Sequence, residues 1–435
     1  MADWKDIASS KPISAYSIFC GELDYPRSLL KQIRSGNKHG FNSWDIHVKP
    51  RNSNASSGEI IRGFDKYYYH NFVNTVFPDH NGSDNHNSNP EFAGETERLS
   101  REINKTVEIT VRQKTYNIKF EYLDLFFFPH EIVIYCFKCD LTGFSFDDIT
   151  LVNSFFRNSG ITKETKFIFD YLSFIKQSDD SAPIQNSLDF GNKLKVFSLV
   201  EHEITITNEE EEMLLYDLGT CSPIGTAAGV ESRFQPSETY FRELMENNKI
   251  SVFSNWSALA LFDTFTALFQ KNALDNFVWE SGYFNLLYLQ SLYVKHYLFK
   301  INREFFTKGA DHQKLEAEFF EFNKYYNPSN ISYNFLPPII YKKIRYGLAI
   351  SAELNELREG IERADLKHKE KQDKMINDIL TVIAFLAVFS AIWDISEWVY
   401  KLFTGATSSY TMLSGSVTLI ILAVFGIFLV RNYRK

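Results

Sequence analysis

Cysteine is scarce in this sequence: the chain of 435 residues has four, Cys20, Cys136, Cys139 and Cys221. Their scatter predicts reduced thiols and not the disulfide framework of a small secreted protein. Cys136 and Cys139 form a CxxC pair, which could bind zinc or take part in redox chemistry. No second CxxC or HxxxH follows at a useful spacing, and the pair lies inside an expected strand. We therefore expect structural cysteines.

A basic excess is also missing, since 46 Lys and Arg stand against 54 Asp and Glu, for a net charge of -8. Nonspecific nucleic-acid binding needs a basic surface, so no direct binding to nucleic acid is expected. The first ten residues lack the basic-then-apolar pattern of a cleavable signal peptide. No nucleophile–base arrangement, HExxH, P-loop or paired metal motif stands out, so the sequence does not favour an enzyme.

Two long apolar runs lie near the C-terminus, at 376–399 and 412–430. Each approaches the ~20 residues that cross a bilayer core, which predicts a two-helix transmembrane hairpin. The basic residues at its ends are Lys367, Lys369, Lys371 and Lys374 before the first run and Arg431, Arg434 and Lys435 after the second. The loop 400–411 carries only Lys401, so both termini are expected in the cytoplasm and the loop outside. The alternative is that the runs are buried core helices.

The expected fold is an α+β cytoplasmic domain followed by a helical stalk and the transmembrane hairpin. β-Branched and aromatic residues predict consecutive strands, and a helix between them makes the first domain α/β. The strands are expected at 107–111, 116–128, 131–139 and 196–206, with the helix at 147–157. The parts are expected as a cytoplasmic α/β domain 1–206, a helical cytoplasmic domain 207–336, a stalk helix 337–375, a first span 376–399, an external loop 400–411, a second span 412–430 and a basic cytoplasmic tail 431–435.

Helices are expected to dominate after residue 206. Asn208 can cap a helix that begins with four glutamates, where acidic residues suit the helix dipole. Further helices are predicted at 255–270, 279–306 and 312–326.

Proline is absent from 339 to 400, which predicts one continuous helix of ~60 residues and ~90 Å. A seam of apolar residues at spacings of three and four is typical of a coiled coil that packs on copies of itself or on neighbouring helices. Its members are Ile340, Ile350, Leu354, Leu357, Ile361 and Ala364.

The order of these parts, and the stretch 377–384 at the start of the first span, resembles the CorA family of divalent-cation transporters. The resemblance implies a homopentameric funnel whose five stalk helices line one central pore. CorA transporters carry Gly-Met-Asn at the outer end of the first span, whereas residues 397–401 here read Glu-Trp-Val-Tyr-Lys. Magnesium selectivity is therefore not expected to carry over.

CorA-like proteins without that motif include membrane effectors of type III CRISPR antiviral systems, and this chain resembles that branch. The resemblance implies an ion channel in the bacterial inner membrane that disrupts membrane integrity. Its implied activator is a nucleotide second messenger, such as adenylated S-adenosylmethionine (SAM-AMP) or a cyclic oligoadenylate. The alternative is a constitutive transporter of Mg²⁺ or another divalent cation with an altered selectivity filter.

At about 100° per residue, one face of the first span combines polar, small and apolar residues. The predicted pore-lining residues are Asn377, Leu380, Thr381, Ala384, Val388, Ala391 and Ile395. The polar ones would form rings at the cytoplasmic end, and the apolar ones a constriction that gates by dewetting. The alternative is that this face packs on the second span. Asp394 and Glu397 could attract cations, or could lie in water at the membrane interface.

An anionic nucleotide needs arginines, aromatic rings and backbone donors. Arg157 follows two phenylalanines, and Asp217 and Arg233 flank the small-residue loop 219–229. Asp217 could accept a hydrogen bond from a ribose, while Arg157 or Arg233 could contact phosphate. Residues of these types are more often surface ion-pair residues, and the loop lacks the lysine of a P-loop.

Overall fold

The computed structural model describes most of the chain. The described residues are 3–23, 41–43, 64, 66–69, 72–73, 97–130, 132–158, 193–230, 234–307, 311–328 and 330–405. The chain divides into two compact units, Met1–Leu357 and Arg358–Lys435. The second apolar run 412–430, the tail 431–435 and Arg233 lie outside the described residues, so the predictions made for them stay predictions.

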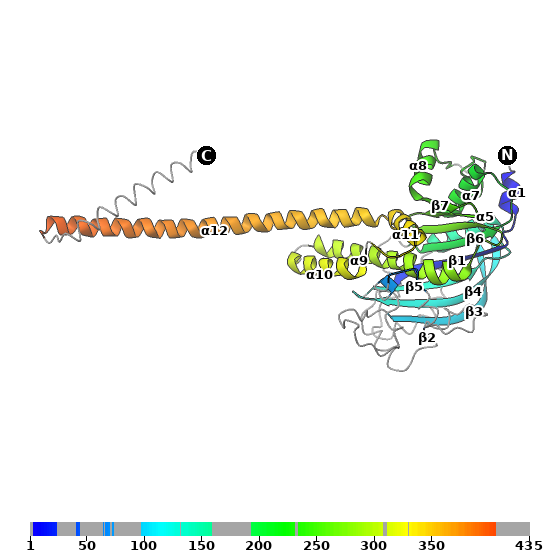
Figure 1. The fold of residues 1–435 in the computed structure, drawn as a ribbon, viewed down its shortest axis with the longest axis horizontal. Coiled ribbons are helices and arrows are strands. Elements are labelled where there is room, and N and C mark those ends of the chain that lie inside the picture. Colours follow the sequence, from blue (N-terminus) through cyan, green and yellow to red (C-terminus); the bar gives the residue numbers. More distant parts are fainter. Residues whose placement is uncertain are drawn as a thin grey trace. The chain divides into compact units, whose positions relative to one another are not determined.

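The first unit is built on one mixed sheet, which in the described part of the chain has nine strands (Figure 1). Its order is β2-β3-β4-β5-β1-β6-β9-β8-β7, and all neighbours are antiparallel except β6 and β9. The strands are β1 (Ser14–Leu23), β2 (Asn42–Ser43), β3 (Glu97–Val111), β4 (Lys114–Phe128), β5 (Ile132–Asp140), β6 (Lys195–His202), β7 (Lys249–Phe253), β8 (Trp256–Ala260) and β9 (Thr264–Gln270).

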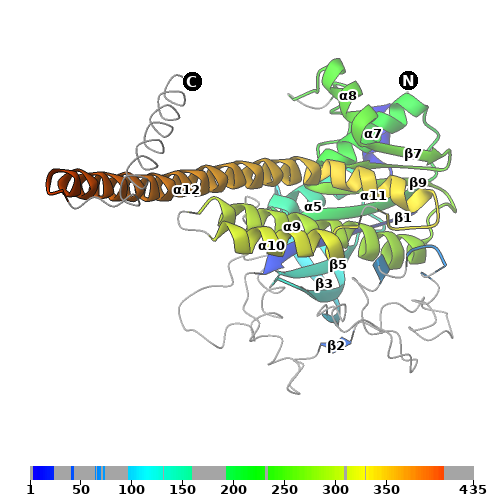
Figure 2. The ribbon, with the colours of Figure 1, turned by 60° about the vertical axis from the view of Figure 1, so that its left-hand side comes forward.

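Helices cover both faces of this sheet. The helices are α1 (Trp4–Ser9), α5 (Phe146–Asn158), α7 (Asn208–Thr220), α8 (Glu238–Asn248), the π-helix η4 (Phe277–Tyr288), α9 (Leu289–Phe305), α10 (His312–Tyr326) and α11 (Leu336–Gly347). On one face Phe19 of β1 contacts Phe156 of α5, with ring centroids 4.8 Å apart. On the other face Phe128 of β4 stacks on Tyr293 of α9 at 4.5 Å. Figure 2 shows α9 and α10 lying side by side.

The predicted α/β character of the N-terminal part is confirmed. The strands expected at 107–111, 116–128 and 131–139 are found in β3, β4 and β5, and α5 matches the predicted helix at 147–157 within one residue at each end. Arg112 and Gln113 both have positive φ, 47° and 70°, in the tight turn between β3 and β4. Such turns match the twist of a hairpin, which explains why the sequence reverses there without glycine.

The expected division at residue 206 is wrong, because the sheet continues beyond it. β9 pairs in parallel with β6, so residues on both sides of that position share one sheet. The predicted helix 255–270 is the hairpin β8–β9. A continuous apolar run cannot distinguish a buried strand from a buried helix, and both strands are almost wholly buried.

Two predicted helix details also change. Thr207, and not Asn208, caps α7: its hydroxyl accepts a hydrogen bond from the Glu210 backbone N–H, and the Glu210 carboxylate accepts one from the Thr207 N–H. The predicted helix 279–306 is found, but its first part is the π-helix η4. The predicted helix 312–326 corresponds to α10.

The predicted continuous stalk helix is wrong, because it breaks after Gly347. The chain resumes as α12 (Ile350–Phe403), and Ala349 between them has a φ of 56°. A Cβ on Gly347 would lie 2.5 Å from the carbonyl oxygen of Ala260, so the backbone of α11 touches the backbone of the sheet. This contact joins segments far apart in the sequence, so the helical periodicity of the sequence could not predict it.

The N-terminal part of the predicted coiled-coil seam is buried in its own unit. Ile340, Ile350, Leu354 and Leu357 are at most 8% exposed. They are core residues of the first unit, so they cannot form a seam between copies of the chain. In the second unit the described residues from Arg358 to Phe403 all belong to α12, whose 54 residues correspond to about 80 Å.

Candidate functional site

Helix α12 contains a segment that is long and apolar enough to cross a membrane, and it is the one helix of that kind among the described residues. None of that segment is buried. Large apolar side chains project from every side of it, including Ile379, Leu380, Val382, Ile383, Phe385, Leu386, Phe389, Ile392 and Trp393. A helix that is apolar all round needs an apolar environment all round, which a lipid bilayer supplies.

The predicted pore face divides into two parts. Ala384, Val388, Ala391 and Ile395 are half-buried within this single chain, at spacings of four, three and four. Leu380, by contrast, is 56% exposed. Half-burial within one chain records packing inside that chain and does not test a pore formed by several copies, so both interpretations from the sequence stay open.

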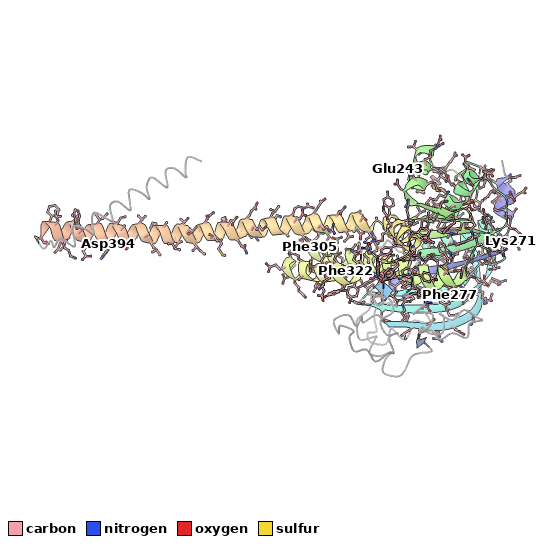
Figure 3. All side chains as sticks on the ribbon, in the orientation of Figure 1. Glu243, Lys271, Phe277, Phe305, Phe322 and Asp394 are labelled. Carbon is pink, nitrogen blue, oxygen red and sulfur yellow. The ribbon has the colours of Figure 1, made fainter. Side chains whose placement is uncertain are left out.

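Two of the polar groups predicted to act in the first span, Thr381 on this face and Glu397 on another, have partners in the helix. The Thr381 hydroxyl donates to the carbonyl oxygen of Asn377 at 2.7 Å, a common way for threonine to satisfy its hydroxyl within a helix. Glu397 forms an ion pair with Lys401, one turn later. Asp394 is exposed near the far end of α12 (Figure 3). Pairing with Lys401 offsets the charge of Glu397, so Asp394 is the better of the two candidates for attracting cations.

Asp217 holds the small-residue loop together from inside. Its side chain is fully buried, and its carboxylate accepts backbone hydrogen bonds from Gly225 at 2.7 Å and from Ala227 at 2.9 Å. Burial raises the pKa of Asp217 to about 7, against the opposing effect of these donors. In this conformation the Asp217 carboxylate already accepts hydrogen bonds from the loop, so a hydrogen bond that it accepts from a ribose stays a prediction. The amides that could have held a phosphate already bind this carboxylate.

Arg157 reaches the same end of α7 from α5. Its Nη1 donates to the carbonyl oxygen of Thr220 at 2.9 Å, which satisfies an otherwise unpaired group of the last helical turn. The structure therefore brings two of the three predicted nucleotide ligands, Arg157 and Asp217, to one end of α7, but it uses both to build the loop. A phosphate contact by Arg157 or Arg233 stays a prediction.

Sequence reasoning missed a polar cluster between the sheet and η4. Lys138 forms ion pairs with Glu121 at 3.0 Å and Glu280 at 2.7 Å, and the Tyr122 hydroxyl donates to Glu280 at 2.7 Å. The Lys138 ammonium also lies 4.2 Å from the ring centroid of Tyr16. Burial alone would lower the pKa of Lys138, but the two carboxylates raise it. The members are far apart in sequence, so no local pattern could have identified them.

A second buried cluster lies near this one on the same side of the sheet, around the oppositely charged Arg98 and Asp124. The Arg98 guanidinium lies 4.5 Å from the ring centroid of Phe126, and Ser100 donates to Asp124. Burial lowers the pKa of Arg98 to about 9 and raises that of Asp124 to about 7. The charged groups of both clusters contact groups from neighbouring elements, so their chemistry is that of a polar core. Among the described residues no group of three His, Cys, Asp or Glu side chains could hold a metal ion.

The four cysteines are free and buried, as the sequence predicted for structural thiols. Cys136 faces Cys20 across the β1–β5 pair, with sulfur atoms 3.3 Å apart. Burial raises the pKa of Cys136 and Cys139 well above the usual thiol value and that of Cys221 to about 11. Thiolate is the reactive form, so these thiols are expected to be inert in the folded protein.

Comparison with known proteins gave no relative from which a function could be transferred. No protein-family model, no curated protein and no solved structure matches the chain.

Proposed function

We propose that this chain is one subunit of a ligand-gated ion channel, anchored by α12 and the following apolar run 412–430. The observation that carries the proposal is the apolar segment of α12, none of which is buried and which continues without interruption from a charged helical segment that begins in a folded α/β unit. As the resemblance to CorA implies, the channel is a homopentamer in the bacterial inner membrane, with both termini in the cytoplasm.

The change of composition along α12 gives the expected position of the membrane boundary. Lysines are frequent up to Lys374, and the apolar residues begin at Met375. Leaving a Leu or Phe side chain in water costs about 1.5–3 kcal/mol of free energy relative to burying it. The many exposed apolar residues of α12 therefore favour insertion of this segment into lipid. Lysines at the cytoplasmic boundary fit the positive-inside rule.

The activator is proposed to be a nucleotide second messenger such as SAM-AMP or a cyclic oligoadenylate, which binds the cytoplasmic part and shifts a closed-to-open equilibrium. This step rests on the resemblance to CRISPR-associated CorA-like effectors, with Arg157 and Arg233 as proposed phosphate ligands. Asp394 is proposed to raise the local cation concentration at the outer end of the pore. The second candidate, constitutive divalent-cation transport, differs in needing no nucleotide.

The membrane assignment predicts a large difference between two substitutions of equal exposure. Leu366 and Leu386 are 61% and 60% exposed, one in the charged segment and one in the apolar segment. In membranes, Leu366→Cys is expected to react with a water-soluble maleimide at least about tenfold faster than Leu386→Cys, because apolar surroundings suppress the thiolate. Mass spectrometry of the labelled peptides measures both rates, and the wild-type chain with its buried cysteines is the blank. Equal rates in native membranes would show that the apolar segment of α12 lies in water.

The gating assignment predicts ion flux that depends on a nucleotide. The purified protein in liposomes is expected to stay closed alone and to admit ions to a trapped fluorescent ion indicator when SAM-AMP or a cyclic oligoadenylate is added. ATP and AMP serve as nucleotide controls. Magnesium flux without any nucleotide would instead establish the constitutive transporter, and the absence of flux with every ligand and cation tested would reject both.

A further inference from the structure

The first turn of α12 is fastened to the folded unit by a partly buried ion pair. Lys295 of α9, which is 1% exposed, forms an ion pair with Glu353, and the Asn302 side chain donates to the Glu353 carbonyl oxygen at 3.5 Å. Ile350 and Leu354 are buried on either side of Glu353. Charge and apolar contact therefore fix the same turn.

Phe262 positions the ammonium group of this pair. Its ring lies in the turn between β8 and β9, where it is contacted by two lysines: the Lys195 Nζ lies 4.0 Å from the ring centroid and the Lys295 Nζ lies 4.9 Å from it. Lys195 also donates to the Phe262 carbonyl oxygen at 2.9 Å and to Asp263 at 2.8 Å. The Phe262 ring is 44% exposed, so it contributes to cation–π contacts more than to the core.

The backbone next to the pair is shaped by the same turn. Gly347 packs its Cα against the carbonyl group of Ala260, two residues before Phe262, and Ala349 takes a left-handed conformation that is uncommon for a residue with a side chain. The α11–α12 connection thus combines a fixed point at Gly347 with a strained residue two positions later. Conformations of this kind persist only where surrounding contacts hold them in place.

The Lys295–Glu353 pair is incompletely satisfied. One carboxylate oxygen of Glu353, Oε2, is buried and has no hydrogen-bond partner among the described residues. Burial raises the pKa of Glu353, against the opposing effect of Lys295. A buried pair with an unmatched oxygen gains less from the contact than a fully bonded pair, since desolvation offsets much of the attraction. Such a contact holds the helix in place, but its net contribution to the free energy of docking is small.

We propose that the Lys295–Glu353 pair, with Phe262 beneath it, is a latch that docks the first turn of α12 in the closed state and is released on opening. The inference rests on the proposed channel function and adds its control element. Backbone hydrogen bonding is continuous along α12, so a change in the docking of its first turn is carried into the membrane segment. A ligand that binds better to the undocked state then opens the channel.

Glu353→Gln tests the latch, because it removes the charge and keeps the shape of the side chain. Glu362→Gln is the matched control: the same substitution, about two and a half turns along the helix, at an exposed residue. Hydrogen exchange of the backbone amides of residues 350–357 measures docking in the purified full chain, whether or not the protein conducts. Exchange is expected to become about tenfold faster in Glu353→Gln, equivalent to about 1.4 kcal/mol, and to be unchanged in Glu362→Gln.

Liposome flux then tests whether docking controls conduction. Glu353→Gln is expected to raise flux without ligand by several-fold and to lower the nucleotide concentration needed for half-maximal flux. Phe262→Leu, at a partly exposed position, is expected to change the ligand-free flux and the half-maximal nucleotide concentration in the same directions, but by smaller amounts.

Unchanged exchange in Glu353→Gln overturns the latch, even if the channel proposal holds. Faster exchange with unaltered flux also overturns it, since the pair then docks the helix without affecting conduction. If the wild-type chain conducts under no condition, the channel proposal and the gating role fail together, while the exchange rates still establish the docking contact.

Discussion

Replacing Gly347 with alanine is expected to destabilise the first unit by about 3 kcal/mol. This is the upper end of the usual range for substitutions that add atoms to a closely packed site. The new Cβ would lie 2.5 Å from the carbonyl oxygen and 2.7 Å from the carbonyl carbon of Ala260. Those atoms belong to the backbone of β8, so they cannot rotate away as a side chain would. Relief requires α11 to move away from the sheet, which opens the packing around Ile344 and Leu348.

Gly282→Ala is the matched control for this prediction. A Cβ there meets its nearest neighbour, the Phe64 ring, at 3.6 Å, an ordinary van der Waals contact. Thermal unfolding of both variants in the same detergent measures the difference: the midpoint is expected to fall by about 4 °C for Gly347→Ala and to stay within about 1 °C of wild type for Gly282→Ala. Equal midpoints for the two variants would show that α11 does not touch the sheet at this point.

The Gly347 contact also illustrates what the sequence could not reveal. Helix periodicity and the lack of proline both favoured one helix through residues 347–350, and the break is caused by a β-strand that lies far away in the sequence. The strand Thr264–Gln270 was mistaken for a helix for a related reason: it is buried on both faces, so its apolar residues do not alternate. Where a single local signal was sufficient, as in α5 or the β4–β5 hairpin, the prediction was close to the structure.

The candidate ligand residues show a second kind of limit. The sequence singled out Asp217 and the small-residue loop as candidates for ligand binding, because a carboxylate and a run of backbone amides are both binding groups. What it could not show is that they bind each other. Likewise, Lys295 and Glu353 are ordinary charged residues in helical segments, and only the fold buries one against the other. Composition identifies groups that need partners, and tertiary structure decides which partners they take.

Replacing Val388 with asparagine is expected to make the channel conduct without ligand, with flux at least about tenfold above wild type. A hydrophobic constriction blocks ions by excluding water, and an amide at the narrowest ring lowers the free energy of the hydrated state. Five copies of the substitution act at one level of the proposed pentamer, so a modest change per subunit is multiplied. Flux from liposomes loaded with a fluorescent ion indicator, with no nucleotide present, measures the effect.

Val382→Asn distinguishes a pore face from any other face of α12. It is the same substitution, six residues earlier and about a third of a turn away around the helix, at a side chain that is 59% exposed where Val388 is half-buried. If the face of Ala384, Val388 and Ala391 lines the pore, only Val388→Asn conducts. If that face instead packs on the second apolar run, Val388→Asn buries an amide between two helices, and the expected result is less folded protein in the membrane with flux unchanged. Conduction by both variants would mean general damage to the bilayer segment. The pair of valines therefore separates the two interpretations that half-burial of this face leaves open.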